Sequence, residues 1–101
     1  MNTFEKIYEA VKSIPEGRVA TYAQVAIMAG NPRWTRVVGN ALHKNPDPLV
    51  IPCHRVVNSK GEVSENFAFG GRMAQRKKLE KEGIVFNEKG RINLEKFGIE
   101  I

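Results

Sequence analysis

The sequence holds one cysteine, and its neighbours make it the strongest candidate for covalent chemistry. Cys53 follows Pro52 and precedes His54 and Arg55. A free cysteine is most often a small buried hydrophobic side chain, and that is the alternative to a reactive role. At its ordinary pKa of about 8.5, only a small fraction of a thiol is nucleophilic thiolate at neutral pH. Lowering that pKa by one or two units needs about 1.4 to 3 kcal/mol of anion stabilisation, which nearby cations or dipoles can supply.

His54 is the nearest candidate base for this thiol. Adjacent residues of an extended strand point to opposite faces, so a direct Cys53–His54 hydrogen bond requires that the backbone turns there. Otherwise a water molecule must relay the proton. The imidazole would also need an orienting carboxylate, and the spacing does not choose among Glu80, Glu82 and other acids. A buried histidine satisfied by backbone groups is the alternative.

Composition bounds the class of protein. The 101 residues are 42% hydrophobic and 27% charged, so we expect one soluble domain over residues 1–101. Apolar runs are too short to span a membrane, and the amphipathic N-terminus does not resemble a signal peptide. One cysteine excludes an internal disulfide, and one cysteine with two histidines does not make a conventional zinc site. We therefore expect a monomer in the reducing cytoplasm, with no metal and no cofactor.

Most of the excess positive charge lies in the middle third of the chain. The net charge is +5, and residues 31–60 hold five basic residues against one acidic residue. A polyanion is therefore the first expected partner. The alternative is that surface lysines and arginines only keep a small protein soluble.

Three helical segments precede the cysteine. Apolar residues at helical spacing predict a helix over residues 4–14. A capping-box pattern at Thr21 and Gln24 begins a second helix that stops at Gly30. An asparagine before proline then predicts a third helix over residues 32–44. A short helix, a tight turn and a longer helix make a helix-turn-helix.

One face of the third helix is basic and carries amide groups. At about 100° per residue, its polar stripe falls within an arc of about 100° beside an apolar arc. Residues 31–46 contain no acid, whereas an ordinary solvated face would mix in Glu or Asp. Cations suit phosphates, and Arg or Asn suits base edges, so we predict DNA contact. The stripe consists of Arg33, Arg36, Asn40, His43 and Lys44.

The second half predicts short β elements and one more helix. Residues 49–51 form an apolar run expected to be a strand or extended segment, while residues 18–20 are expected to be only a connector. A helix is expected over residues 72–82, and a small β-hairpin over residues 84–94 with its turn at 87–90. The predicted fold is a mostly helical α/β domain, winged-helix-like, with a helix-turn-helix and a short C-terminal hairpin.

The cysteine motif resembles the active-site signature of the O6-alkylguanine-DNA alkyltransferases, the methylated-DNA–protein-cysteine methyltransferases. The similarity continues over most of the chain and covers the C-terminal, DNA-binding and catalytic domain of that family. Many members carry a further N-terminal domain, which the similarity does not include. The matching segments are Pro15-Glu16-Gly17, Thr21-Tyr22, Val25-Ala26, Gly30-Asn31-Pro32, Arg36-Val37-Val38-Gly39, Asn45-Pro46, Ile51 to Val56, and Glu82-Gly83.

The resemblance implies a single-use DNA repair reaction. The helix-turn-helix would enter the minor groove of duplex DNA containing O6-alkylguanine, and the damaged base would flip out. Cys53 would accept the alkyl group, with His54 and Glu82 as a water-bridged relay that removes its proton. Tyr22 would assist flipping, and Arg36 would fill the vacated stack.

The same resemblance assigns supporting residues. Asn45 would brace the turn between the recognition helix and the cysteine segment. Pro48 would line the alkyl pocket, and Arg55 would hold structure. Together with Tyr22 and Arg36, the expected DNA contacts are Arg33, Asn40 and Lys44.

Two departures from the family keep alternatives open. Residues 64–69 are longer and more aromatic than the expected loop over the guanine. The short length also resembles alkyltransferase-like proteins, which bind alkylated guanine without repairing it and mark it for nucleotide excision repair. Those proteins typically carry tryptophan in place of Cys53, so the cysteine favours transfer. A plain helix-turn-helix regulator with an inert cysteine is the remaining alternative.

Overall fold

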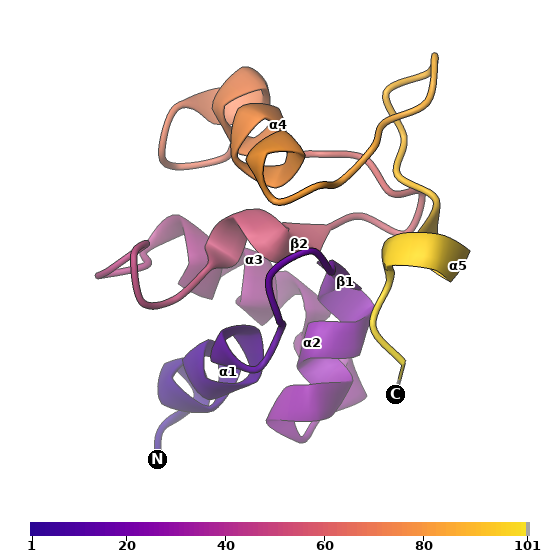
Figure 1. Cartoon of the computed structure of the whole chain (residues 1–101). Coiled ribbons are helices and arrows are strands. Elements are labelled where there is room, and N and C mark those ends of the chain that lie inside the picture. Colours follow the sequence, from indigo (N-terminus) through magenta and orange to yellow (C-terminus); the bar gives the residue numbers. More distant parts are fainter. Residues whose placement is uncertain (101) are drawn as a thin grey trace.

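The structure is a computed structural model, and it describes residues 1–100. Helices α1 and α2 lie on one side of a two-stranded sheet, and α4 lies on the other (Figure 1). The architecture is mostly helical, as the sequence predicts. No helix among the described residues is long and apolar enough to cross a membrane. The elements are α1 (Thr3–Lys12), β1 (Ala20–Thr21), α2 (Tyr22–Ala29), η1 (Pro32–Trp34), α3 (Thr35–His43), η2 (Cys53–Arg55), β2 (Val56–Val57), α4 (Gly71–Lys81) and α5 (Leu94–Phe97).

Capping residues fix the first two helices where the sequence predicts them. The side chain of Asn2 accepts a hydrogen bond from Glu5 N at 2.8 Å and begins α1. Thr21 and Gln24 form a complete capping box at the start of α2, with distances of 2.9 and 3.1 Å. Gly30 ends α2 at φ 114°, a left-handed conformation that glycine adopts without a steric penalty. The predicted helix-turn-helix is observed as α2, the turn at Gly30 and Asn31, and α3.

The prediction that one α-helix starts at residue 32 is wrong. Pro32–Trp34 forms a 3₁₀ turn, in which Asn31 Oδ1 accepts from Arg33 N at 2.9 Å, and α3 begins only at Thr35. Arg33 therefore lies on the turn before the recognition helix and outside its helical stripe. The inner face of α3 packs into the main core, and Tyr8 donates its hydroxyl hydrogen to Ala41 O at 2.8 Å, which joins α1 to α3.

The small sheet forms from segments that the sequence places wrongly. Strands β1 and β2 are parallel, with Ala20 opposite Val56, so the expected connector at residues 18–20 supplies part of a strand. The expected strand at residues 49–51 is a turn, because Ile51 N bonds back to Asp47 O at 2.9 Å. Leu49 is 93% exposed there, so its apolar character does not mark burial.

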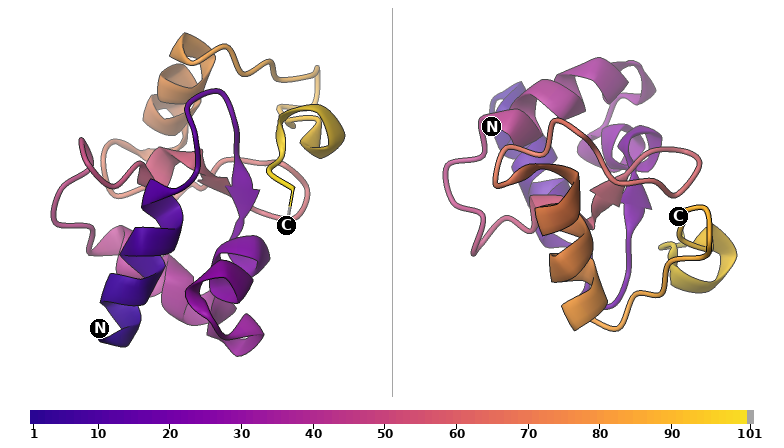
Figure 2. Two further views of the ribbon diagram at one scale, coloured as in Figure 1. Left: turned by 60° about the horizontal axis from the view of Figure 1, so that its bottom comes forward. Right: turned by 90° about the horizontal axis from the view of Figure 1, so that it is seen from above.

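The C-terminal residues close the sheet edge. The expected hairpin is reduced to one antiparallel bridge between Phe86 and Ile92, and Leu94 begins the short helix α5. Val19 N bonds to Phe97 O, and Ile99 N bonds to Val19 O, both at 2.9 Å. These bonds hold the C-terminal segment beside β1, as two further views show (Figure 2).

Candidate DNA-binding and catalytic site

The helix-turn-helix presents an exposed row of polar side chains, which we call the basic ridge. Its cations form no ion pair among the described residues, and Asp47 is the single acid in residues 31–60. The carboxylate of Asp47 instead accepts from Leu49 N at 3.1 Å. The ridge cations are therefore free to meet an anion. The ridge consists of Arg33, Arg36, Asn40 and Lys44, all exposed.

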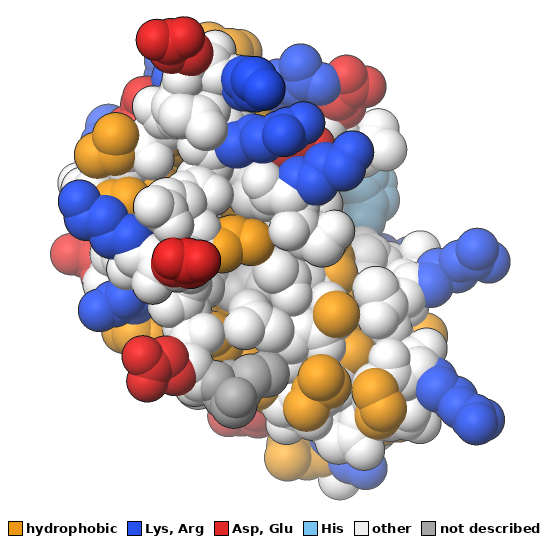
Figure 3. All heavy atoms as spheres, turned by 90° about the vertical axis from the view of Figure 1, so that its right-hand side faces the viewer, with side chains coloured by type: hydrophobic (Ala, Val, Ile, Leu, Met, Phe, Trp, Pro, Cys, Tyr) orange, Lys and Arg blue, Asp and Glu red, His pale blue; other side chains and the backbone are white. Residues whose placement is uncertain are grey.

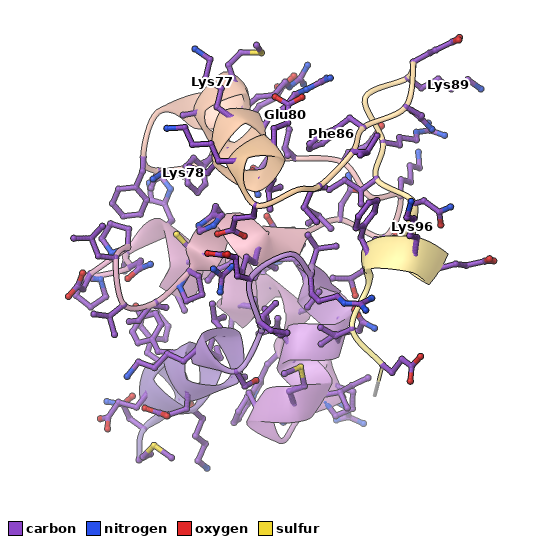
Figure 4. All side chains as sticks on the ribbon, in the orientation of Figure 1. Lys77, Lys78, Glu80, Phe86, Lys89 and Lys96 are labelled. Carbon is purple, nitrogen blue, oxygen red and sulfur yellow. The ribbon has the colours of Figure 1, made fainter. Side chains whose placement is uncertain are left out.

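A second group of cations lies over α4 and the hairpin, at the top of Figure 3. Arg76 contacts the ring of Phe86, with its guanidinium carbon 4.6 Å from the centroid, and pairs with Glu80 at 3.3 Å. Lys77 and Lys78 point from the opposite side of α4 (Figure 4). Glu80 interrupts this group, and Arg76 is engaged in local contacts, whereas the cations of the basic ridge form no ion pair among the described residues.

The backbone turns at the cysteine, which is the condition that a direct Cys53–His54 hydrogen bond requires. Residues 53–55 form the 3₁₀ turn η2, in which Arg55 N bonds to Pro52 O at 3.0 Å. Cys53 is only 4% exposed, but it lines a cavity of about 380 Å³. That cavity lies between α3 and the loop of residues 64–70. Its lining residues are Tyr22, Gly39, Asn40, Leu42, His43, Cys53, Val56, Ser64, Asn66, Phe67, Ala68 and Gln75.

The Cys53 thiol is protonated in the resting protein. Burial raises its pKa above the ordinary value, and this effect outweighs the stabilisation of the anion by the Asn45 side chain, nearby backbone N–H groups and Lys78. The surroundings therefore include groups able to stabilise a thiolate, but they do not generate one unaided. A reaction at this sulfur needs a base to take the proton.

His54 and Glu82 form a dyad beside the cysteine turn. His54 Nε2 lies 2.8 Å from Glu82 Oε2. Burial lowers the pKa of His54 despite the opposing effect of Glu82, so the imidazole is neutral near pH 7. Because the carboxylate only accepts, Nε2 carries the proton and Nδ1 is left as an acceptor. Among residues 1–100, no hydrogen bond joins the side chains of Cys53 and His54 directly.

Glu82, rather than Glu80, is the carboxylate at this site. Glu80 lies on the exposed face of α4 and pairs with Arg76. Burial acts to raise the pKa of Glu82, but hydrogen bonds from Arg55 and His54 outweigh it and hold that pKa below its ordinary value. Glu82 is therefore ionised near pH 7. The sequence left these two acids undecided, and only the resemblance pointed to Glu82.

Arg55 and Asn45 hold the cysteine turn in place. Arg55 donates to both oxygens of Glu82 at 2.9 and 2.8 Å and to Ile14 O at 2.8 Å, so it joins the end of α4 to the segment after α1. Asn45 is buried, donates to Ile51 O at 2.8 Å and accepts from Asp47 N at 2.9 Å. Both side chains therefore bond to backbone on either side of the cysteine turn, and the roles that the resemblance implies for them stay predictions.

The remaining site residues divide between the cavity and its surroundings. Tyr22 lines the cavity, and burial raises the pKa of its hydroxyl against a hydrogen bond with Ser64. Arg36 and Pro48 are not among the lining residues of this cavity, and the pocket role expected for Pro48 stays a prediction. Sequence reasoning pointed to the aromatic loop that contains Phe67 and missed Gln75. The sequence gives no signal for Gln75, because α4 is mostly polar and Leu79 is the only large apolar residue on the same face.

Residues 2–84 match the family model described as "6-O-methylguanine DNA methyltransferase, DNA binding domain". The chain belongs to this family. Its match to the methylated-DNA–protein-cysteine methyltransferase of Rattus norvegicus is 39% identical over 82 residues, covering 81% of the chain and 39% of the rat protein. The chain thus spans about two fifths of the length of that relative.

Shorter members of the methyltransferase family match over more of their own length. Alkyltransferase-like protein 1 of Schizosaccharomyces pombe is 42% identical over 82 residues, covering 80% of the chain and 75% of that protein. A DNA base-flipping protein of Vibrio parahaemolyticus is 41% identical over 92 residues, covering 91% and 90%. The crystal structure of S. pombe Atl1 with damaged DNA containing O6-carboxymethylguanine superposes with a TM-score of 0.82 and 35% identity, covering 98% and 95%. The fold is that of the family's DNA-binding domain.

Proposed function

We propose that this protein repairs DNA by stoichiometric transfer of an alkyl group from O6-alkylguanine to Cys53. The observation that carries the proposal is the position of the thiol, which lines a cavity shared with Asn40 of the basic ridge. A base inside a duplex cannot present its alkyl carbon to a protein nucleophile, so the damaged nucleotide must flip into this cavity. A volume of about 380 Å³ lies within the usual range for pockets that bind small molecules.

The proposed reaction needs no cofactor, because the sulfur is itself the reagent. His54 Nδ1 takes the thiol proton through one water molecule, while Glu82 holds the imidazole tautomer. The thiolate attacks the alkyl carbon, a carbon–sulfur bond forms, and the bond from that carbon to guanine O6 breaks. The displaced guanine anion takes up a proton and is restored. Cys53 ends as a stable thioether, so each molecule acts once.

The basic ridge would hold the duplex through its minor groove. Lys44 and Arg33 would contact phosphates, and Asn40 would contact DNA at the mouth of the cavity. Arg36 would occupy the space that the flipped base leaves, which offsets part of the few kcal/mol that flipping costs. Tyr22, which lines the cavity, would contact the flipped guanine. The similar S. pombe Atl1 structure is a complex with damaged DNA, which supports damaged DNA as the partner.

Intact-mass measurement tests the transfer. After incubation with duplex DNA containing O6-methylguanine, we expect a rise of about 14 Da, one CH₂ group, on the peptide with Cys53. Cys53→Ala should show no rise, and undamaged DNA should give none with the unmodified protein. A mass that stays constant while lesion-containing DNA binds would overturn the transfer.

A non-catalytic lesion-binding protein is the second candidate. Two observations favour it: the raised pKa of Cys53, and the extensive matches to proteins named alkyltransferase-like and base-flipping. In this case the cavity would hold the flipped base without reaction, and excision repair proteins would be recruited. Binding titrations separate it from an ordinary regulator, since a regulator should prefer a defined undamaged sequence over O6-methylguanine in any sequence.

A further inference from the structure

Gln75 is a buried polar side chain that takes no part in the proposed reaction. It lies on the inner face of α4, is 1% exposed, and lines the cavity that holds the thiol. Burying a carboxamide is costly unless its donors and acceptor are satisfied. The groups that satisfy Gln75 therefore indicate what it holds together.

The carboxamide of Gln75 joins two separate backbone segments. Nε2 donates to His54 O at 3.1 Å, in the cysteine turn, and to Val56 O at 2.9 Å, in the strand after it. Oε1 accepts from Ser64 N at 2.9 Å, where the loop of residues 64–70 begins. Two carbonyl acceptors and one N–H donor fix the orientation of the amide, because the opposite orientation would face donor to donor.

Apart from Gln75, the loop of residues 64–70 is held by a hydrogen bond between Tyr22 and Ser64, an ion pair between Glu65 and Arg72 of α4, and packing of Phe67 and Phe69 on the main core. Its remaining backbone hydrogen bonds, within the part of the chain that the structure describes, run from Asn66 N and Phe67 N to Ser64 and from Gly71 N to Phe67. These bonds are internal to the loop or reach only the first residue of α4. The loop supplies one wall of the cavity through Ser64, Asn66, Phe67 and Ala68. Gln75 is therefore the side chain that bonds this wall to the wall carrying the thiol.

We propose that Gln75 is a positioning residue that sets the width of the lesion cavity and with it the size of alkyl group accepted. The inference rests on the proposed function, because it needs O6-alkylguanine to enter this cavity. With all three bonds intact, the loop wall stays at a fixed distance from Cys53, and a bulky substituent must displace it. Without them, no hydrogen bond from Gln75 links the loop to the cysteine turn, the loop is held mainly by the packing of Phe67 and Phe69, and the penalty for a bulky substituent falls.

The test compares two adducts on the same duplex, O6-methylguanine and O6-benzylguanine. Gln75→Met keeps the shape of the side chain and removes all three hydrogen bonds. We expect the preference for methyl over benzyl, measured as the ratio of transfer rates or of dissociation constants, to fall by about tenfold in this variant. Hydrogen exchange should also show faster exchange at the Ser64 amide, which loses its acceptor. A variant that only lowers the folded fraction would reduce handling of both adducts alike.

Leu79→Ala is the matched control, since Leu79 is fully buried one turn along α4 and belongs to a different apolar cluster. It should destabilise the fold and leave the adduct ratio unchanged. If Gln75→Met does not fold, Gln75→Glu takes its place, because it keeps the acceptor for Ser64 N and loses both donors. A folded Gln75 variant with the unmodified protein's adduct ratio overturns the inference. Failure of the unmodified protein to distinguish either adduct from plain DNA overturns the proposed function instead.

Discussion

Replacing Glu82 with glutamine isolates the charge at the centre of the candidate site. Glu82 is 13% exposed and accepts three hydrogen bonds, one from His54 and two from Arg55, at 2.8 to 2.9 Å. Glutamine offers only one oxygen, so its amide group must face a donor of Arg55 or His54. Each hydrogen bond to a charged partner contributes about 1.5 to 3 kcal/mol, and breaking a buried ion pair costs about 3 to 5 kcal/mol. Because Arg55 keeps its bond to Ile14 O, we expect a loss of about 3 kcal/mol in unfolding free energy.

Urea unfolding monitored by circular dichroism measures this loss. For a domain of this size, a change of about 3 kcal/mol corresponds to a fall in Tm of about 12 to 24 °C. Glu80→Gln is the matched control on the same helix, because its pair with Arg76 is exposed and should contribute less than about 1 kcal/mol. Equal losses in the two variants would refute the assignment of Glu82 as the buried anchor of His54 and Arg55.

The pH dependence of the Glu82→Gln effect has a definite sign. The folded pKa of Glu82 is below its unfolded value, so the stabilisation is present above the unfolded pKa and is lost as pH falls through the folded one. The contribution of Glu82 ionisation to the stability difference between the two proteins should therefore shrink below about pH 4, whereas between about pH 5 and 7 the difference also includes protonation of His54, whose pKa Glu82 acts to raise. A difference that does not shrink below about pH 4 would contradict the lowered pKa of Glu82.

Three further changes test the other parts of the site. The folded pKa of Cys53 is raised, so the unfolding free energy should fall as pH rises past the unfolded thiol pKa of about 8.5. Cys53→Ala should lack this fall when urea unfolding is measured between about pH 7.5 and 10. Matching pH profiles of the two proteins would contradict burial of the thiol. Arg36→Ala should weaken binding to lesion-containing duplex about tenfold more than binding to plain duplex, and equal losses would exclude a role in the vacated stack. Lys44→Gln should reduce the slope of log affinity against log salt by about 0.9 if Lys44 contacts a phosphate, and an unchanged slope would remove it from the interface.

Local signals account for the parts of the fold that the sequence predicts. The capping box at Thr21 and the left-handed Gly30 are set by neighbours within a few residues, so their pattern is visible in the chain. The strand expected at residues 49–51 does not form, and the reason is also local. Pro46, Asp47 and Pro48 impose a turn that apolar content alone does not reveal, and the strand forms only after the 3₁₀ turn at the cysteine. Parallel pairing of residues 20 and 56 depends on a distant partner.

The candidate site also divides into residues that a local pattern predicts and residues that depend on distant partners. The residues of the basic ridge lie on one short segment, so the sequence predicts all four together with His43, and all four are exposed in the structure, although Arg33 lies on the turn before α3. The choice between Glu80 and Glu82 depends on which side of α4 faces His54, and the residues alone do not fix that rotation. Gln75 is harder still, because its partners are backbone groups that come together only in the folded chain. Side chains that satisfy distant backbone groups leave almost no local pattern.

Burial of the thiol is consistent with a reagent that is used once. A protein that is consumed by each transfer loses its function whenever an unrelated electrophile reacts with Cys53. A raised pKa and little exposure keep the thiolate fraction low and limit such losses. The neutral His54 beside an ionised Glu82 complements this burial, because Nδ1 can accept the thiol proton while the resting imidazole carries no charge. In the proposed reaction, the flipped base is what brings an alkyl carbon to the sulfur, so nucleophile and substrate meet only where the basic ridge has already bound DNA.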